Sequence, residues 1–335
     1  MKRIAVIGAG NWGTALGIIL ARAGHDVRLW SRNAEVVQSV NRDHLNAVYL
    51  TDFRIPEAVQ ATQEIVHAVE GAELVLLATP SHATRAVLRS MTSSLRADMI
   101  FVSATKGMEI ETGLRISQVV HEVVGKEFAP RFVCLSGPSF AKEVVEKHPT
   151  AIVAASANAE DARMVQSEFS FQTLRVYTND DVVGTELGGS VKNVMAIAAG
   201  LVAGLGYGSN SVAALITRGL AEMTRLALHE GAKLETLMGL AGLGDLVLTC
   251  TGALSRNRFV GRELGKGRSL DDITAGMDEV AEGVKTTQAV KRLANRRGVE
   301  MPITAEVQAV LYEGKGPQEA ASELMMRPLR GEFER

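Results

Sequence analysis

The chain has 335 residues, of which 46% are hydrophobic and 22% are charged. This composition excludes disordered and fibrous proteins, and the length predicts two domains with ample core. The formal net charge is −2 at pH 7 and no long basic run occurs, so we expect no nucleic-acid partner. Glycine takes 32 positions and proline only 8, an excess that neither a collagen repeat nor a low-complexity segment explains.

The cysteines and the longest apolar stretch indicate where the protein works. Cys134 and Cys250 both lie in apolar surroundings, so neither a disulfide framework nor a metal site is predicted. Lys2 and Arg3 precede an apolar run that is too short for a signal peptide. The longest apolar stretch, residues 194–205, falls short of the ~20 residues that span a bilayer. We therefore expect a cytoplasmic protein without stable membrane insertion.

The first half of the chain alternates short apolar runs with helix-like segments. Because short continuous apolar runs suit strands covered on both faces, the pattern predicts a doubly wound α/β domain. The predicted strands are residues 4–7, 27–30, 74–78, 100–103, 132–135, 151–155 and 174–177.

The second half of the chain is expected to be all-helical. From about Gly184 onward the strand signal disappears and long helical patterns follow. The predicted helices are residues 191–205, 211–229, 271–278, 286–297 and 304–312. No Pro- or Ser-rich linker separates the halves, so the change of pattern places the boundary near Gly188, within a helix. The predicted domains are residues 1–188 and 189–335.

A glycine-rich loop follows the first predicted strand directly. The segment Gly8-Ala9-Gly10-Asn11-Trp12-Gly13 stands between that strand and a helix. In a dinucleotide-binding fold Gly8 permits the tight turn, Gly10 admits the pyrophosphate and Gly13 permits close helix–sheet packing. The alternative is a purely structural turn. The strand–turn–helix context favours a dinucleotide-binding, Rossmann-like first domain.

The end of the second predicted strand bears on the choice of cofactor. A carboxylate there would favour NAD, but the residues are Ser31-Arg32-Asn33. Arg32 can pair with a 2′-phosphate, so NADP(H) is favoured and NAD(H) tolerated. Alternatively, Arg32 is an exposed arginine that stacks on adenine without selecting the phosphate.

Polar residues follow four of the predicted strands, where ligands bind in open parallel sheets. Lys106 is the only cation among them and is suited to a phosphate or a reacting hydroxyl. Gly137 and Ser139 offer hydrogen bonds, although Ser139 and His82 could simply cap helices. The four segments are Thr79-Pro80-Ser81-His82, Thr105-Lys106-Gly107, Ser136-Gly137-Pro138-Ser139-Phe140-Ala141 and Thr178-Asn179-Asp180.

Lys192 is the one charge in an otherwise apolar or small run, residues 188–200. Burial disfavours the ammonium form, and a nearby cation such as Lys106 would lower the pKa of Lys192 further, as suits a general base. The alternative is a lysine that reaches from a buried helix to the surface. Gly188 and Gly189 either let another backbone or the cofactor come close or break the helix.

Isolated polar residues also occur farther along the chain. Asp245 lies in the glycine-rich apolar segment 239–250, where it could orient Lys192, bind a hydroxyl or cap the next helix. Ser255, Arg256 and Asn257 open a helical stretch, an arrangement suited to an anion such as a phosphate. The alternative is a capped helix with solvated arginines. Glu282 is a second isolated acid, to which spacing alone gives no role.

Together these motifs resemble the bacterial-type NAD(P)-dependent glycerol-3-phosphate dehydrogenase family from end to end. The resemblance implies reversible hydride transfer between C2 of sn-glycerol 3-phosphate and the nicotinamide, with dihydroxyacetone phosphate as the other substrate. It also implies reduction in the service of glycerophospholipid synthesis, a homodimer, and a substrate-binding role for residues 189–335. The matching segments are GAGNWGTA at 8–15, ATKG at 104–107, SGPSFAKE at 136–143, GGSVKNVMAIAAG at 188–200, ALITRGLAEM at 214–223, GLAGLGDLVLTC at 239–250 and SRNR at 255–258.

The resemblance also implies roles for individual residues. Lys192 is implied as the proton acceptor, and Ala141, Val280 and Glu282 enter through the family alone. Many relatives carry a second basic residue where Asn33 stands, which implies a weaker grip on the 2′-phosphate and mixed NAD and NADP use. The implied substrate residues are Lys106, Gly137, Ser139, Lys192, Asp245, Ser255, Arg256 and Asn257. The implied cofactor residues, beside Gly8, Gly10 and Gly13, are Asn11, Trp12, Arg32, Lys106, Ala141, Arg256, Val280 and Glu282.

Two other functions are compatible with parts of this pattern. A related two-domain hydroxyacid dehydrogenase would share the glycine loop and the helical half, but the segment 255–257 argues against it. A non-catalytic nucleotide sensor would share the first domain, but Lys192 in its apolar setting argues against that function.

Overall fold

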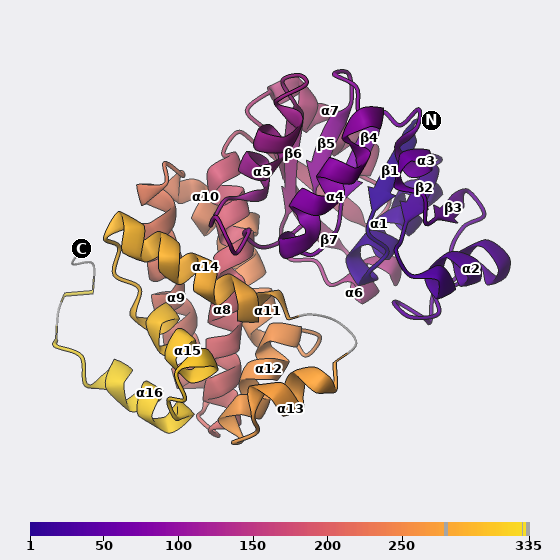
Figure 1. Ribbon diagram of the computed structural model, residues 1–335. Helices are drawn as coiled ribbons and strands as arrows, with labels where there is room; N and C mark the ends of the chain where they lie inside the picture. Colours follow the sequence, from indigo (N-terminus) through magenta and orange to yellow (C-terminus); the bar gives the residue numbers. More distant parts are fainter. Residues whose placement is uncertain (278–280, 330, 333–335) are drawn as a thin grey trace.

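The computed structural model describes residues 1–277, 281–329 and 331–332. The N-terminal part is a sheet with helices on both faces, and the C-terminal part consists of helices around one long central helix (Figure 1). A mostly parallel, helix-covered sheet followed by a helical part confirms the predicted fold class.

The N-terminal sheet has eight strands in its described residues. They are β1 (Arg3–Ile7), β2 (Asp26–Trp30), β3 (Val59–Thr62), β4 (Leu74–Leu77), β5 (Ile100–Ser103), β6 (Arg131–Ser136), β7 (Thr150–Ala155) and β8 (Leu174–Asn179). Their order is β3-β2-β1-β4-β5-β6-β7-β8, and all neighbours are parallel except β6 and β7. The order reverses beside β1, which opens a crevice beyond the carboxyl ends of β1 and β4.

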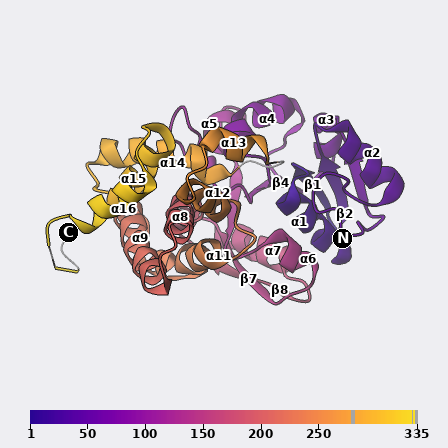
Figure 2. The same ribbon diagram turned by 90° about the horizontal axis from the view of Figure 1, so that it is seen from below.

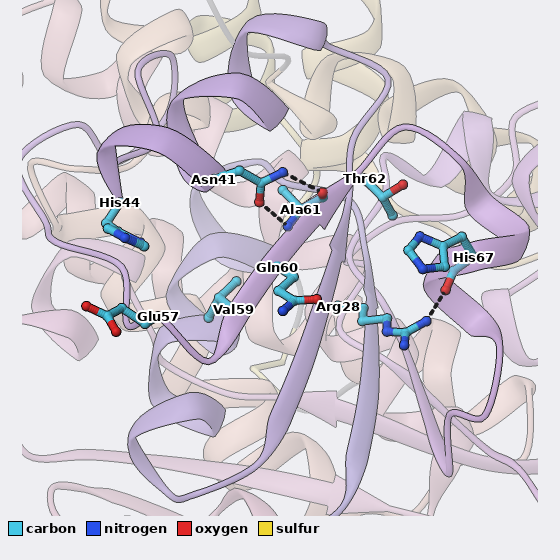
Figure 3. Close-up of a pocket in the computed structure, with 9 residues that line it drawn as sticks. All are labelled: Arg28, Asn41, His44, Glu57, Val59, Gln60, Ala61, Thr62 and His67. Carbon is cyan, nitrogen blue, oxygen red and sulfur yellow. Dashed lines mark hydrogen bonds between the residues drawn. The ribbon is translucent and has the colours of Figure 1, made fainter.

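Strand β3 was not among the predicted strands. It lies at an edge of the sheet and alternates buried with less buried residues, so it lacks the continuous apolar run of the central strands. The Asn41 side chain accepts a hydrogen bond from the Ala61 N–H at 2.8 Å and donates one to the Ala61 carbonyl oxygen at 2.9 Å (Figure 3). The amide thus covers backbone groups that would otherwise pair with another strand.

Helices cover the two faces of the sheet in separate layers (Figure 2). One apolar cluster joins the sheet to α1, α2, α6 and α7, and another joins it to α3, α4 and α5. The bounds are α1 (Asn11–Arg22), α2 (Ala34–Asp43), α3 (Ile65–Val69), α4 (Thr84–Met91), α5 (Ile116–Val124), α6 (Ala141–Val145) and α7 (Ala159–Phe169), with 3-10 turns η1 (Ser81–Ala83) and η2 (Thr92–Ser94).

The C-terminal part is built around α8 (Val182–Gly204), which is buried over most of its length. No strand follows β8 among the described residues, as predicted. Predicted helix 271–278 corresponds to α13, and residue 278 lies outside the described residues. The other elements are α9 (Ser209–His229), α10 (Leu234–Met238), the π-helix η3 (Leu240–Gly244), α11 (Asp245–Thr251), α12 (Arg256–Gly265), α13 (Leu270–Ala275), α14 (Glu282–Arg297), α15 (Pro302–Tyr312) and α16 (Pro317–Met325).

Helix α8 runs through the predicted domain boundary at Gly188. The helix continues through Gly188 and Gly189, so the helix-breaking alternative is wrong. A Cβ at Gly188 would lie 2.5 Å from the Ala241 carbonyl oxygen, and one at Gly189 would lie 2.7 Å from Ser136 Oγ. Close approach of other segments is therefore the reason for both glycines. Among the described residues α8 is the one helix long and apolar enough to cross a membrane, but 83% of its apolar window is buried within the protein.

Candidate active site

A cleft of about 770 Å³ lies between the carboxyl ends of the central strands and the helical part. The sheet side contributes Gly8, Gly10, Asn11, Trp12, Arg32, Lys106, Ser139 and Ala141 to its walls. The helical side contributes Lys192, Asp245, Ser255, Arg256, Asn257 and Glu282. Gly13 and Gly137 are buried behind these walls, and Val280 lies outside the described residues. Residues chosen from distant parts of the sequence therefore meet at one place.

The glycine loop has the geometry that a dinucleotide requires. Gly8 has φ +117°, and a Cβ there would lie 2.7 Å from the Ala78 carbonyl oxygen. A Cβ at Gly13 would overlap the carbonyl oxygen of Gly8. Gly10 precedes α1 in an extended conformation and, as a glycine N-cap, provides no side-chain cap, so the backbone N–H groups of this helix start are suited to phosphate oxygens. Trp12 Nε1 is buried without a described hydrogen-bond partner. The loop fits the pyrophosphate of a nicotinamide dinucleotide.

The end of β2 presents one cation to the cleft. The Arg32 side chain is exposed and lines the wall. Asn33 also lines the cleft, and its side chain accepts a hydrogen bond from the Glu35 N–H at 2.9 Å. Asn33 is therefore the N-cap of α2.

A buried cluster of two lysines and one carboxylate connects the two walls, because Lys106 comes from the sheet side and Lys192 and Asp245 come from the helical side. Lys192 Nζ donates to Asp245 Oδ1 at 2.8 Å and to Thr249 Oγ1 at 2.7 Å. Lys106 Nζ donates to Asp245 Oδ2 at 2.8 Å and to the Gly137 carbonyl oxygen at 2.9 Å. Because an ammonium group has three donors, each lysine keeps one N–H beyond these two bonds. Both lysines line the cleft.

Burial decides the protonation behaviour of this cluster. Burial, opposed by Asp245 and assisted by the Lys106 ammonium group, lowers the pKa of Lys192 to about 8. Burial also pushes the pKa of Asp245 upward, but the two ammonium groups outweigh that effect and hold the pKa of the carboxyl below its usual value. Asp245 thus stays ionised while Lys192 can lose its proton near neutral pH. The side chain of Asp245 orients the lysines, and the expected alternative of a helix cap is wrong, because Gly244 precedes α11 as its N-cap.

The end of β6 supports Lys106 through backbone. The Gly137 carbonyl oxygen accepts hydrogen bonds from Lys106 Nζ and, at 3.0 Å, from Ser139 Oγ. Gly137 has φ +136°, and a Cβ would lie 2.9 Å from Ile152 Cα. Only glycine fits a turn this close to the neighbouring strand β7. Ser139 lies before α6, whose N-cap is Phe140.

The start of α12 combines an arginine, a buried amide and a capped helix terminus. Ser255 Oγ accepts a hydrogen bond from the Arg258 N–H at 3.2 Å and is the N-cap of α12. Asn257 Oδ1 accepts from the Gly283 N–H at 2.9 Å, and Asn257 Nδ2 donates to Asn193 Oδ1 at 3.0 Å. Since the Gly283 N–H can only donate, the orientation of both amides is fixed. One N–H of Asn257 and the amide nitrogen of Asn193 remain for other partners, and both residues line the cleft.

Glu282, the first residue of α14, joins the helical wall to the sheet wall. Ser81 Oγ donates to Glu282 Oε2 at 2.8 Å. Burial raises the pKa of the Glu282 carboxyl, while hydrogen bonds from the Ser81 side chain and backbone lower it. No local pattern predicts this contact, because the two residues are 201 positions apart.

Several cleft residues were not identified from the sequence. Thr249 and Asn193 each follow an identified residue on the same helix and carry the hydrogen bonds described above. Tyr49, Asp52 and Phe53 line the cleft from the irregular segment between α2 and β3, which shows no motif. Thr249 is one helical turn after Asp245, a spacing that could have identified it.

One expected strand end does not contribute to the cleft. Residues 178–180 are absent from its walls, and Asn179 Nδ2 instead donates to Thr236 Oγ1 at 3.2 Å. Because β7 is antiparallel to β6 and β8 is parallel to β7, β8 runs opposite to β1, β4, β5 and β6. The expectation assumed an all-parallel sheet and is wrong for this segment.

Comparison with known proteins places the whole chain in one family. The model "NAD-dependent glycerol-3-phosphate dehydrogenase N-terminus" matches residues 3–162, and "NAD-dependent glycerol-3-phosphate dehydrogenase C-terminus" matches residues 181–322. The chain is 58% identical over 330 residues to glycerol-3-phosphate dehydrogenase [NAD(P)+] of Koribacter versatilis, covering 98% of each chain. It is 54% identical over 333 residues to the protein of that name from Nitratidesulfovibrio vulgaris, covering 98% of this chain and 100% of that one.

Solved structures agree with these matches. The crystal structure of glycerol-3-phosphate dehydrogenase from Coxiella burnetii superposes with a TM-score of 0.94 at 41% identity, covering 97% of this chain and 99% of that one. A ketopantoate reductase from Ralstonia eutropha superposes with a TM-score of 0.58 at 18% identity, covering 96% and 100%. The second likeness concerns the fold alone and gives no support to the alternative of a different dehydrogenase.

Proposed function

The chain belongs to the NAD(P)-dependent glycerol-3-phosphate dehydrogenase family, and from that premise we propose how its side chains divide the work of the reaction. The protein is an oxidoreductase that acts on the CH–OH group of sn-glycerol 3-phosphate with NAD(P) as cofactor. A role in phospholipid synthesis is consistent with this activity. The proposal concerns which residues hold the cofactor and substrate and which residue moves the proton.

The sheet wall holds the cofactor. When bound, the nicotinamide accepts hydride from C2 of glycerol 3-phosphate or donates it to dihydroxyacetone phosphate. Gly8, Gly10 and Gly13 shape the loop for the pyrophosphate, with Asn11 and Trp12 at the helix start and Arg32 at the adenosine end. Ala141 and Glu282 line the same cleft and complete the described part of this set, while the family-derived Val280 lies outside the described residues.

Lys192 carries the proton, and one observation supports this role above all. Its ammonium group is buried at the wall of the cleft with two of three donors fixed and with its pKa lowered to about 8. Neutral Lys192 therefore accepts the C2 hydroxyl proton during oxidation. In reduction the ammonium form donates that proton and stabilises negative charge on the carbonyl oxygen.

Asp245 and Lys106 prepare Lys192 for this exchange. Asp245 accepts from both lysines and so holds their nitrogen atoms on one side of the cleft. Lys106 lowers the pKa of Lys192. It also presents its remaining N–H to the C2 oxygen of the substrate. Gly137 and Ser139 belong to the substrate site mainly because they hold Lys106 and the turn after β6.

The start of α12 holds the substrate phosphate. Arg256 offers a fork of charged donors, Asn257 offers an amide N–H, and the Ser255 hydroxyl can donate while its oxygen caps the helix. The positive end of the helix dipole adds to the attraction for an anion. Binding of the phosphate would fix C2 beside Lys192.

Substitution of Lys192 tests the proton-transfer proposal. We expect Lys192→Ala to lower kcat by about 10²- to 10⁴-fold, the usual range for a general acid–base group, while the Kd for NADPH stays unchanged. Lys192→Arg keeps the charge but cannot give up a proton at neutral pH, so it should be equally impaired. Lys126→Ala, at an exposed lysine, is the control. Near-normal turnover of either Lys192 variant with dihydroxyacetone phosphate and NADPH would remove Lys192 from this role.

We further propose that the protein works as a cytoplasmic homodimer. The family resemblance supports both points. Sedimentation equilibrium of the purified protein would measure the assembly, and a mass of one chain at micromolar concentration would contradict it.

A further inference from the structure

The contact between Ser81 and Glu282 links the sheet wall to the helical wall directly. Ser81, 2% exposed, belongs to the turn η1 after β4, and Glu282 is the first residue of α14. The Glu282 carboxylate accepts hydrogen bonds from both the hydroxyl and the backbone N–H of Ser81. Arg256 and Lys285 are the cations near the Glu282 carboxylate. Removal of its hydrogen-bond donors strongly destabilises a buried carboxylate, so separating Ser81 from Glu282 is energetically unfavourable.

On the helical side, the contact fixes the first turn of α14 beside the substrate amide. Gly283 follows Glu282, and its N–H donates to Asn257 Oδ1 at 2.9 Å. A Cβ at Gly283 would lie 2.7 Å from both Asn257 Oδ1 and the Asn193 carbonyl oxygen. A displacement of α14 at this end would therefore move Asn257 as well.

On the sheet side, the same contact packs against the residue after Lys106. A Cβ at Gly107 would lie 2.7 Å from Ser81 Oγ and 3.0 Å from Glu282 Oε2. The backbone next to Lys106 thus rests on the Ser81–Glu282 contact. Asn257 is connected to this contact through the Gly283 N–H, and Lys106, on the opposite wall, is the residue before Gly107.

The C-terminal end of α14 makes weaker contacts with the loop that follows Gly107, between β5 and α5. Arg292 and Arg296 donate to the carbonyl oxygens of Ile110 and Thr112 at 3.2 and 3.1 Å, both in exposed positions. Exposed charged contacts contribute little. The Ser81–Glu282 contact is the buried connection, and it lies at the end of α14 nearest the chemistry.

We propose that Ser81 is a positioning residue that acts through Glu282 and Gly283 to set the distance between Asn257 and Lys106 across the cleft. This inference rests on the proposed role of Asn257 in holding the substrate phosphate. Ser81 itself need not touch substrate or cofactor.

The test compares Ser81→Ala with Ser90→Ala. Ser90 is an exposed serine of α4 whose hydroxyl bonds within its own helix, so its loss should leave the kinetics unchanged. We expect Ser81→Ala to raise the KM for dihydroxyacetone phosphate about tenfold at saturating NADPH, the size of one lost hydrogen bond to a charged group. The change in kcat should be less than about threefold, because Lys192 is untouched. The acid limb of kcat/KM should move to higher pH, since the hydroxyl lowers the pKa of Glu282.

Hydrogen exchange gives a readout independent of turnover. In Ser81→Ala, amides of residues 281–285 should exchange faster than in the wild-type protein, because the first turn of α14 has lost the hydroxyl donor that anchors Glu282. If KM, pH profile and exchange all match those of Ser90→Ala, the proposal is overturned. If the kinetics change while exchange at 281–285 does not, it is likewise overturned, because the effect does not pass through α14.

A double-mutant cycle with Glu282→Gln tests the pairing. If Ser81 acts through Glu282, Ser81→Ala/Glu282→Gln should raise the KM no more than Glu282→Gln alone. Additive effects would contradict the proposal.

The variant Asn257→Ala separates this inference from the proposed role of Asn257 in holding the substrate phosphate. If Asn257→Ala leaves the KM for dihydroxyacetone phosphate unchanged, Asn257 does not hold the phosphate. The expected effect of Ser81 on the KM is then refuted as well. If Asn257→Ala raises the KM but Ser81→Ala leaves it unchanged, only the positioning role of Ser81 is overturned.

Discussion

The two walls of the cleft are built by different means. The sheet wall offers backbone to a ligand, because a Cβ at Gly8 or Gly13 would crowd a neighbouring carbonyl oxygen and α1 starts from the glycine N-cap Gly10. The helical wall offers side chains to a ligand, because Lys192 and Asp245 are buried and hydrogen-bonded to each other, and Asn257 is buried and hydrogen-bonded to Asn193.

This difference predicts opposite sensitivities. Atoms added to the sheet wall should abolish binding, whereas atoms removed from the helical wall should abolish chemistry or substrate recognition. Conversely, truncation of Arg32, an exposed side chain of the sheet wall, should have a small effect. Each prediction below tests one side of this contrast.

The largest effect is expected from one added methyl group in the glycine loop. Gly8→Ala places a Cβ 2.7 Å from the Ala78 carbonyl oxygen at φ +117°, so the turn must shift. A shift of about 1 Å at a binding loop can cost about 100-fold, and we expect a loss of that size in NADPH affinity, measured by fluorescence titration. Gly24→Ala is the matched control, since Gly24 has φ +93° but open space around it. It should lower Tm through backbone strain of about 1–3 kcal/mol and leave affinity intact. Equal affinities of the two variants would break the contrast.

The next effect concerns removal of a charge from the helical wall. Arg256→Ala should raise the KM for dihydroxyacetone phosphate about 10- to 100-fold, since hydrogen bonds to charged groups contribute about 1.5–3 kcal/mol. Turnover of unphosphorylated dihydroxyacetone should be equally poor in the wild-type and variant proteins. A variant that loses activity equally on both substrates would place Arg256 outside the phosphate site.

The sheet wall was the easier of the two to predict from the sequence. Its strands are continuous apolar runs, and the loop residues follow strand ends at fixed places, so local pattern located Gly8, Arg32 and Lys106. The failures there have physical causes. Edge strand β3 lacks an apolar run, and the reversed direction of β8, which removes residues 178–180 from the cleft, depends on pairing that no local pattern records.

The helical wall was predicted only in part. Lys192 and Asp245 were detectable because a charge in an apolar run is costly. Their joint hydrogen bonding with Lys106 depends on how α8, α11 and β5 pack, and the partners are 53 and 139 positions apart. Asn257 was predicted, but its hydrogen bonds to Asn193 and Gly283 were not. No sequence pattern marks them, since asparagine and glycine are common in helix starts and loops.

The pH dependence of turnover should report the buried lysine. In the proposed mechanism, oxidation of glycerol 3-phosphate requires neutral Lys192, whose pKa is about 8, so kcat should rise with pH through that value. Between pH 7.5 and 6.5 we expect a fall close to tenfold, the limit for one titrating group. Reduction requires the ammonium form, so its kcat should instead decline above about pH 8. Parallel profiles in the two directions would assign the titration to a different group.

The smallest effect is expected at the edge of the sheet wall, where a side chain does the binding. An exposed charge pair contributes about 1 kcal/mol or less, so Arg32→Ala should weaken NADPH binding about fivefold and leave NADH binding unchanged. Arg28→Ala is the matched control, because Arg28 lies on β2, the strand that precedes Arg32, but faces a separate hollow of about 430 Å³ and donates to the His67 carbonyl oxygen (Figure 3).

Asn33→Arg tests the same strand end in the opposite direction. The substitution adds a cation for the cofactor but removes the N-cap of α2. A second cation should tighten NADPH binding severalfold over NADH by the same electrostatic argument. The substitution also removes the cap of α2, where the Asn33 side chain accepts the Glu35 N–H, at a cost of about 1 kcal/mol of stability. NADPH should therefore bind more tightly to a protein with a lower Tm. If the Kd ratio of NADPH to NADH is unchanged by both Arg32→Ala and Asn33→Arg, the end of β2 does not select the cofactor.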